Sequence, residues 1–95
     1  MTKDNSTRSE LLQAMLALQT AEAAAAFFAD LCTLKEIQSL AQRLQVARLL
    51  REGRTFTDIV ERTGASSATI ARVNRCLQAG PGGYKTVLDR LDGKE

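Results

Sequence analysis

The side chains of this sequence that could do chemistry gather in one short stretch, and their chemistry is that of nucleic-acid recognition. Residues 66–75 combine serine, threonine and alanine with arginine. Arginine pairs with phosphates or guanine edges, hydroxyls hydrogen-bond to bases, and small side chains let a backbone approach closely. We therefore expect a DNA-binding surface made of Arg54, Ser66, Ser67, Ala68, Thr69, Ala71, Arg72 and Arg75.

Two short helices joined by a tight turn must position these side chains. Thr55 is a plausible N-cap, Asp58 three residues later completes a capping-box pattern, and the first helix runs into Gly64. Ser66 caps a second helix. The apolar stripe of that second helix consists of Ile70, Val73 and Leu77. The pattern is typical of a helix-turn-helix over about residues 55–79. An ordinary helical hairpin with a solvated basic face is the alternative.

In a helix-turn-helix the second helix enters the major groove, so its outer side chains have distinct roles. The residues expected to face base edges are Ser67, Ala68, Thr69 and Ala71. The residues expected to meet phosphates are Arg54, Arg72, Arg75 and Lys85. Phosphate contacts set the register of the protein on the duplex but carry no sequence information.

The remaining sequence predicts further helices and no strands. Helices are expected over about residues 7–19 and 21–32, from Thr33 to Gly53, and over about 84–91, after the Gly80–Gly83 break. Whether the first two helices are continuous or bend near Thr20 stays open. Residues 1–6 are polar and are expected to fray. The fold class is therefore all-α, with about six helices in a single domain over residues 1–95.

The N-terminal helices carry more apolar surface than a chain of this size can cover by itself. Hydrophobic residues make up 44% of the sequence. The large ones near the N-terminus are Leu11, Leu12, Met15, Leu16, Phe27 and Phe28. Such a face needs a partner surface. A helical monomer with its own four-helix core is the alternative.

The sequence argues against catalysis, a cofactor or a metal. It contains no histidine, which is the commonest general base, and its glycines do not form a phosphate-cradling loop. Cys32 and Cys76 fit no metal-ligand spacing and are expected to be buried free thiols. A net charge of +2 permits nucleic acid without requiring it. We see no signal peptide and no apolar run long enough to cross a bilayer, so the expected location is the cytoplasm.

The stretches CTLKEIQSLAQRLQVARLLREG, RTFTDIVERT and GASSATIARVNRCL resemble the Trp-repressor family over residues 31–79, and most of all its related branch that does not sense tryptophan. The residues that match the family motif are Gly64, Ala65, Ala68, Thr69, Ile70 and Arg72. The resemblance implies an intertwined homodimer that binds double-stranded DNA at a near-palindromic operator and regulates transcription, as a repressor. A rival interpretation is a helical protein–protein interaction module whose helix-turn-helix is structural only.

The same resemblance implies a small-molecule pocket formed by Thr33, Arg43 and Arg72. In tryptophan-sensing members an arginine from each of two helices sandwiches the indole. This sequence has Val73 where those members have glycine, and Cys76 where they have a hydroxyl residue. A β-branched side chain fills space that the indole needs. We therefore expect that tryptophan is not an effector and leave the identity of any other effector open.

Overall fold

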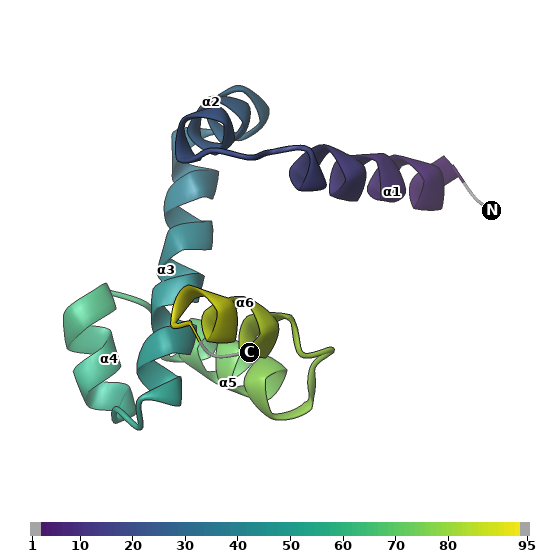
Figure 1. Ribbon diagram of the computed structural model, residues 1–95. Helices are drawn as coiled ribbons and strands as arrows, with labels where there is room; N and C mark the ends of the chain where they lie inside the picture. The colour runs from purple at the N-terminus through teal and green to yellow at the C-terminus, as the bar shows by residue number, and fades with distance from the viewer. Residues whose placement is uncertain (1–2, 94–95) are drawn as a thin grey trace. The chain divides into compact units, whose positions relative to one another are not determined.

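The computed structural model describes residues 3–93, and within that range its regular elements are six α-helices. They are α1 (Lys3–Leu16), α2 (Ala21–Leu31), α3 (Leu34–Arg51), α4 (Phe56–Thr63), α5 (Ser67–Ala79) and α6 (Gly83–Leu91) (Figure 1). The predicted all-α class with about six helices is confirmed. The chain divides into two units, one up to Ile37 and one from Gln38 onward.

Helix α1 begins at Lys3, so the expected fraying was wrong for residues 3–6; residues 1 and 2 lie outside the described part of the chain. The helix extends outward because polar residues such as lysine and serine are only slightly poorer helix formers than alanine. The open question about the first two helices is also resolved. Residues 17–20 separate them, and the Thr20 hydroxyl caps α2 by accepting a hydrogen bond from the Ala23 N–H at 3.0 Å.

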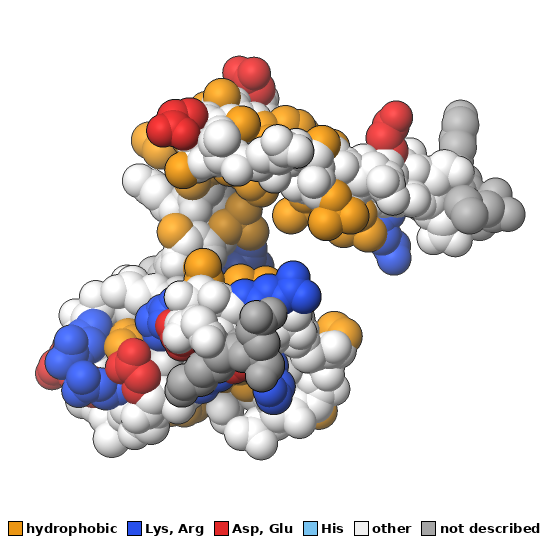
Figure 2. All heavy atoms as spheres, viewed as in Figure 1, with side chains coloured by type: hydrophobic (Ala, Val, Ile, Leu, Met, Phe, Trp, Pro, Cys, Tyr) orange, Lys and Arg blue, Asp and Glu red, His pale blue; other side chains and the backbone are white. Residues whose placement is uncertain are grey.

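The first unit has no core of its own. Among residues 5–37 no side chain is fully buried. Leu12 is 53% exposed and Leu16 is 78% exposed, and hydrophobic side chains lie at the surface of this unit (Figure 2). Phe27 and Phe28 contact each other edge to face, with ring centroids 5.6 Å apart. This leaves an apolar surface that the first unit does not cover by itself.

Helix α3 starts at the capping box that the sequence predicts. The Thr33 hydroxyl accepts from the Glu36 N–H at 3.1 Å, and the Thr33 N–H donates to Glu36 Oε1 at 2.7 Å. The Thr33 N–H most strongly, and the Thr33 hydroxyl next, hold the pKa of the Glu36 carboxyl below its ordinary value by hydrogen bonding to it. The helix ends before Gly53, whose φ of +86° is a left-handed conformation that glycine adopts without strain.

The core of the second unit joins four helices around the helix-turn-helix (Figure 1). Its buried residues are Val46, Ala47 and Leu49 from α3, Ile59 from α4, Ala65 from the turn, Ile70 and Val73 from α5, and Leu88 from α6. Leu77 packs against them, so the predicted apolar stripe of α5 does face the core. Helix α5, which the sequence predicts to read DNA, therefore packs on the core with one side and is exposed on the other.

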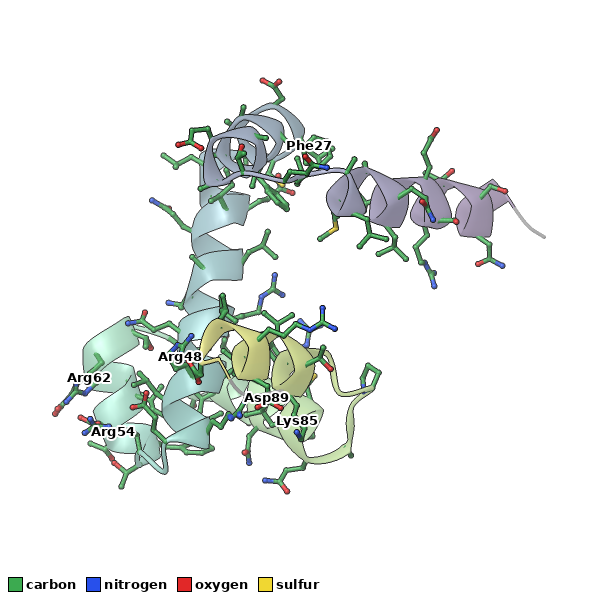
Figure 3. All side chains as sticks on the ribbon, viewed as in Figure 1. Phe27, Arg48, Arg54, Arg62, Lys85 and Asp89 are labelled. Carbon is green, nitrogen blue, oxygen red and sulfur yellow. The ribbon has the colours of Figure 1, made fainter. Side chains whose placement is uncertain are left out.

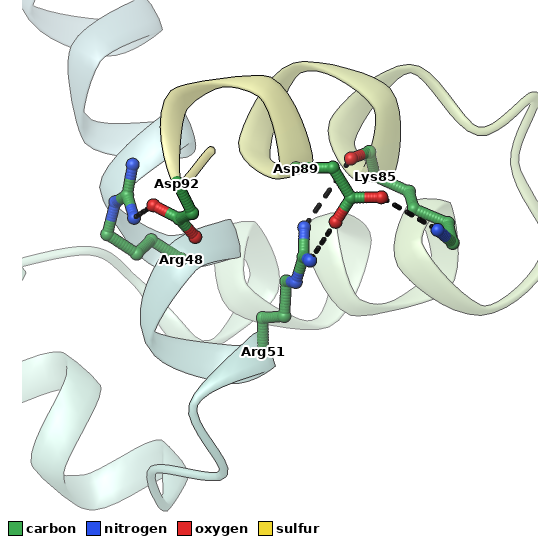
Figure 4. Close-up of polar contacts among 5 residues, drawn as sticks. All are labelled: Arg48, Arg51, Lys85, Asp89 and Asp92. Carbon is green, nitrogen blue, oxygen red and sulfur yellow. Dashed lines mark hydrogen bonds and ion pairs between the residues drawn. The ribbon is translucent and has the colours of Figure 1, made fainter. Parts of the chain in front are cut away.

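Ion pairs tie α6 to the end of α3 (Figure 4). Arg48 Nη1 lies 2.7 Å from Asp92 Oδ1, and Asp89 pairs with both Arg51 and Lys85. The Lys85 ammonium first, and the Arg51 guanidinium next, hold the pKa of the Asp89 carboxyl below its ordinary value. Exposed ion pairs of this kind contribute little to the stability of a fold. Their main effect here is to fix the orientation of α6 against α3.

Candidate DNA-binding surface

The turn of the helix-turn-helix is built from local hydrogen bonds. The Thr55 hydroxyl accepts from the Asp58 N–H at 3.1 Å and caps α4. At the far end of α4, Gly64 has a left-handed φ of +71°. The Thr63 hydroxyl donates to the Ile59 carbonyl at 2.7 Å and accepts from the Ala65 N–H at 3.1 Å. These bonds set the angle at which α5 leaves α4.

The Thr55–Asp58 capping box is formed only in part. In the described residues the reciprocal bond from the Thr55 N–H to the Asp58 carboxylate is absent, and this carboxylate contacts arginines instead. Aspartate is one methylene shorter than the glutamate of the usual motif, so its carboxylate reaches the Ncap N–H less readily.

Ser66 caps α5 and orients Thr69. The Ser66 Oγ accepts from the Thr69 N–H at 3.1 Å, and its hydroxyl donates to Thr69 Oγ1 at 3.0 Å. Ser66 was expected at the DNA surface, and the structure shows its hydroxyl engaged in the cap. The Thr69 hydroxyl keeps its own proton to donate to a ligand.

The outer face of α5 collects most of the predicted surface. Exposed side chains are Ser67, Ala68, Arg72 and Arg75, and half-buried ones are Thr69 and Ala71. Arg72 and Arg75 make no ion pair or side-chain hydrogen bond with any residue in the range 5–93. Arg54, by contrast, lies beside α4 and pairs with Glu52 at 3.8 Å and Asp58 at 3.5 Å.

Charge is divided unevenly between the two units. Ten of the thirteen Lys and Arg residues, but six of the eleven acidic ones, lie in residues 38–95. The second unit therefore carries a net charge of +4 and the first a net charge of −2. From Arg62 to Leu88 the sequence has no acidic residue, and this acid-free stretch includes all of α5. The positive charge of this weakly basic chain is thus concentrated in the unit that contains the helix-turn-helix.

Arg43 and Arg72 come together although they are far apart in sequence. They line a cavity of about 220 Å³ with Val73 and Cys76, and a second of about 140 Å³ with Thr69. Val73 is 1% exposed and belongs to the core, yet it leaves the first cavity open. Thr33 belongs to the first unit, where its hydroxyl caps α3.

A larger cavity of about 440 Å³ has an apolar lining. It is formed by Leu44, Cys76, Pro81, Gly82, Gly83, Tyr84 and Val87. Cys32 and Cys76 are free thiols, as expected, but both are half-buried rather than buried. Cys32 is the C-cap residue of α2, and Cys76 lines this cavity.

Two contributors to this surface escaped the sequence-based prediction. Gln42 Nε2 donates to the Thr63 carbonyl at 3.1 Å, which ties α3 to the end of α4. Arg62 Nε lies 3.1 Å from both carboxylate oxygens of Asp58. The spacing of four residues between Asp58 and Arg62 was a usable signal for this pair, whereas nothing local marks Gln42.

Comparison with known proteins identifies the fold. The family model described as Trp repressor protein matches residues 6–92. The chain belongs to the Trp repressor family. This is a family of DNA-binding regulatory proteins rather than of enzymes, and it was the family that the sequence motifs indicated.

Relatives in the Trp repressor family support this assignment across nearly the whole chain. The uncharacterized protein YerC of Bacillus subtilis (strain 168) is 54% identical over 86 residues, covering 90% of this chain and 83% of YerC. A crystal structure of a candidate Trp repressor from Staphylococcus aureus has a TM-score of 0.88 at 48% identity, covering 92% of this chain and 87% of that one. A TrpR-like protein from Eubacterium eligens ATCC 27750 has a TM-score of 0.88 at 51% identity, covering 95% and 93%.

Among the described side chains, residues 5–93, no group of three or more His, Cys, Asp or Glu could hold a metal ion. None of the described helices is long and apolar enough to span a bilayer.

Proposed function

We propose that the protein is a sequence-specific DNA-binding transcriptional regulator, a repressor, that inserts α5 into the major groove as a homodimer. The observation that carries this proposal is the outer face of α5. There, small and hydroxyl side chains lie beside two exposed arginines, Arg72 and Arg75, that have no partner among residues 3–93. Small side chains allow the close approach that base reading needs, and unpaired arginines are available to phosphates.

Roles within the surface follow from exposure and bonding. We assign base reading to Ser67, Ala68, Thr69 and Ala71, and phosphate contact to Arg54, Arg72 and Arg75. Ser66 supports Thr69 through its cap. Lys85 is less suited than expected, because Asp89 already binds its ammonium at 2.8 Å.

The homodimer is supported by apolar surface in both units. Residues 5–37 bury no side chain fully, and Leu40 and Leu44 of α3 are also exposed. The apolar cavity beside α6 adds to this uncovered surface. A second copy of the chain supplies helices of matching character, and a two-fold pair presents two α5 helices to half-sites about one DNA turn apart. In such a dimer, residues 1–95 of each chain form a single domain. A regulator of this kind acts in the cytoplasm, where bacterial DNA lies.

A salt titration of binding to duplex DNA tests the proposal against the rival interaction module. For a phosphate-binding surface, the logarithm of the binding constant falls linearly with the logarithm of salt concentration. The slope is about −0.9 for each phosphate contact. Selection of bound fragments from genomic DNA then gives the operator. No binding to any duplex at low salt would contradict the proposal and favour the interaction module.

Thr69→Ala is expected to relax discrimination at one base pair of that operator. The hydroxyl that the Ser66 cap orients would be lost, at a cost of about 1–3 kcal/mol for the preferred base. Competition between operators that differ at single positions measures this. Thr86→Ala on α6 is the matched control and should leave the preference unchanged. An unaltered preference in Thr69→Ala as well would remove Thr69 from the reading surface.

Tryptophan is expected neither to raise the melting temperature nor to tighten operator binding. Val73 occupies core space beside Arg72, and Cys76 replaces a hydroxyl in the cavity lining. A thermal scan is sensitive enough, because a ligand at a hundredfold excess over Kd adds about 2.7 kcal/mol to stability. Val73→Gly should enlarge the cavity at about 1 kcal/mol of helix stability. A clear shift with tryptophan in the unmodified protein would restore Arg43 and Arg72 as ligand contacts.

A further inference from the structure

Asp58 lies at the centre of a small charge cluster at the start of α4 that also contains Arg54 and Arg62. Figure 3 labels these two arginines beside α4. Its carboxylate accepts from Arg62 Nε at 3.1 Å on both oxygens, and Arg54 Nη1 lies 3.5 Å from Oδ2. Both arginine side chains are at least 43% exposed, whereas that of Asp58 is 30% exposed. One carboxylate therefore restrains two cations that otherwise extend into solvent.

The position of this cluster matters because of what α4 does in a helix-turn-helix. The first helix of the motif crosses the phosphate backbone, and the N-terminus of a helix favours anions. Arg54 precedes the N-cap of α4, and Arg62 lies on its last turn. A phosphate that reaches this helix must compete with Asp58 for both guanidinium groups.

We propose that Asp58 is an internal competitor for DNA phosphates, which lowers affinity for DNA in general. This rests on the DNA-binding function proposed above. In the free protein the carboxylate holds Arg54 and Arg62. A phosphate that binds either guanidinium must displace this carboxylate, so the net gain from the contact is smaller than it would be without Asp58. This loss falls on operator and non-specific duplex alike.

The rest of the charge pattern supports this selective restraint. The arginines of α5, Arg72 and Arg75, have no acidic partner within residues 3–93, so contact at the reading helix is unrestrained. Restraint falls on α4, where contacts are made to the backbone and carry no sequence information.

Asp58→Asn tests the proposal, with Glu61→Gln as the matched control. Both remove one negative charge from α4, but Glu61 makes no ion pair within the described residues and is exposed. The backbone N–H of residue 58 still donates to Thr55, so the cap is retained. We expect Asp58→Asn to bind non-specific duplex about three- to tenfold more tightly at low salt. We also expect its salt slope to steepen by about 1–2 units, and operator affinity to rise at least as much as non-specific affinity. Glu61→Gln should change binding by less than about twofold.

A second comparison shows whether the gain comes through the arginines. Arg54→Ala with Arg62→Ala should cancel the gain in the Asp58→Asn background. The same pair should change non-specific binding much less when Asp58 is present. Should Asp58→Asn fail to fold by circular dichroism, Asp58→Ser serves in its place, since serine is well tolerated in the first turn of a helix.

Equal effects of Asp58→Asn and Glu61→Gln would overturn the proposal, because net charge alone would then explain both. A gain that survives removal of both arginines would also overturn it. Elution from immobilised heparin separates this proposal from the DNA-binding function. If no version bound duplex DNA but Asp58→Asn eluted at higher salt than Glu61→Gln, the restraint on the arginines would stand and the DNA-binding function would fail. Identical elution would defeat the restraint itself.

Discussion

Replacing Leu12 and Leu16 together with aspartate is expected to abolish dimer formation and, with it, DNA binding. Both side chains are exposed on α1 of the isolated chain, and we propose that a second copy covers them. Two unpaired carboxylates in that contact would each have to be desolvated, which is strongly unfavourable. Sedimentation gives the mass and circular dichroism the helix content.

The control adds the same charge to the polar side of α1. Ser6→Asp with Thr7→Asp should leave mass and DNA binding unchanged, because neither residue is three or four positions from Leu12 or Leu16 and so neither is their neighbour on the helix. If the unmodified protein and the leucine variant were both folded monomers, the proposed dimer would be contradicted and the four-helix monomer supported.

Arg72→Ala combined with Arg75→Ala is expected to weaken binding to every duplex, on the order of a hundredfold or more at about 50 mM salt. Each dimer would lose four phosphate contacts, so the slope of log K against log salt should flatten by about 3–4 units. The ratio of operator to non-specific affinity should change far less, because phosphate contacts carry no sequence information.

Arg90→Ala is a suitable control for this double substitution. Arg90 is an exposed arginine of α6 that also lacks an ion pair within residues 3–93. Removing the Arg90 side chain should change the slope of log K against log salt only slightly. If the double variant instead lost binding only at one base of one operator, an arginine of α5 would be a base reader and its assignment to phosphates would be wrong.

Helix boundaries near the site were predictable because single side chains determine them. Thr33, Thr55 and Ser66 cap the three helices that the sequence assigned to them, and Gly64 has the left-handed conformation that a tight turn needs. Such signals involve residues only three or four positions apart. The early start of α1 had no equivalent signal, since polar residues are compatible with both a frayed end and a helix.

Contacts between distant residues were beyond local patterns. The pairs Arg48–Asp92 and Arg51–Asp89 join residues on different helices, and nothing in the spacing of the sequence indicates them. The same holds for the cavity that Arg43 and Arg72 share, which only the family resemblance suggested. The prediction that Cys32 and Cys76 are buried was wrong, because an apolar helical context does not reveal whether a neighbouring side chain covers the thiol.

The absence of buried side chains in residues 5–37 has a consequence for how the protein would respond to its own abundance. If those residues acquire a core only when two chains meet, operator occupancy depends on the square of chain concentration at low abundance. A twofold rise in synthesis then produces more than a twofold rise in occupancy. Unassembled chains, with α1 and α2 unprotected, are also the ones most open to proteolysis. Turnover would remove the monomer faster than the dimer and make the dose response steeper still.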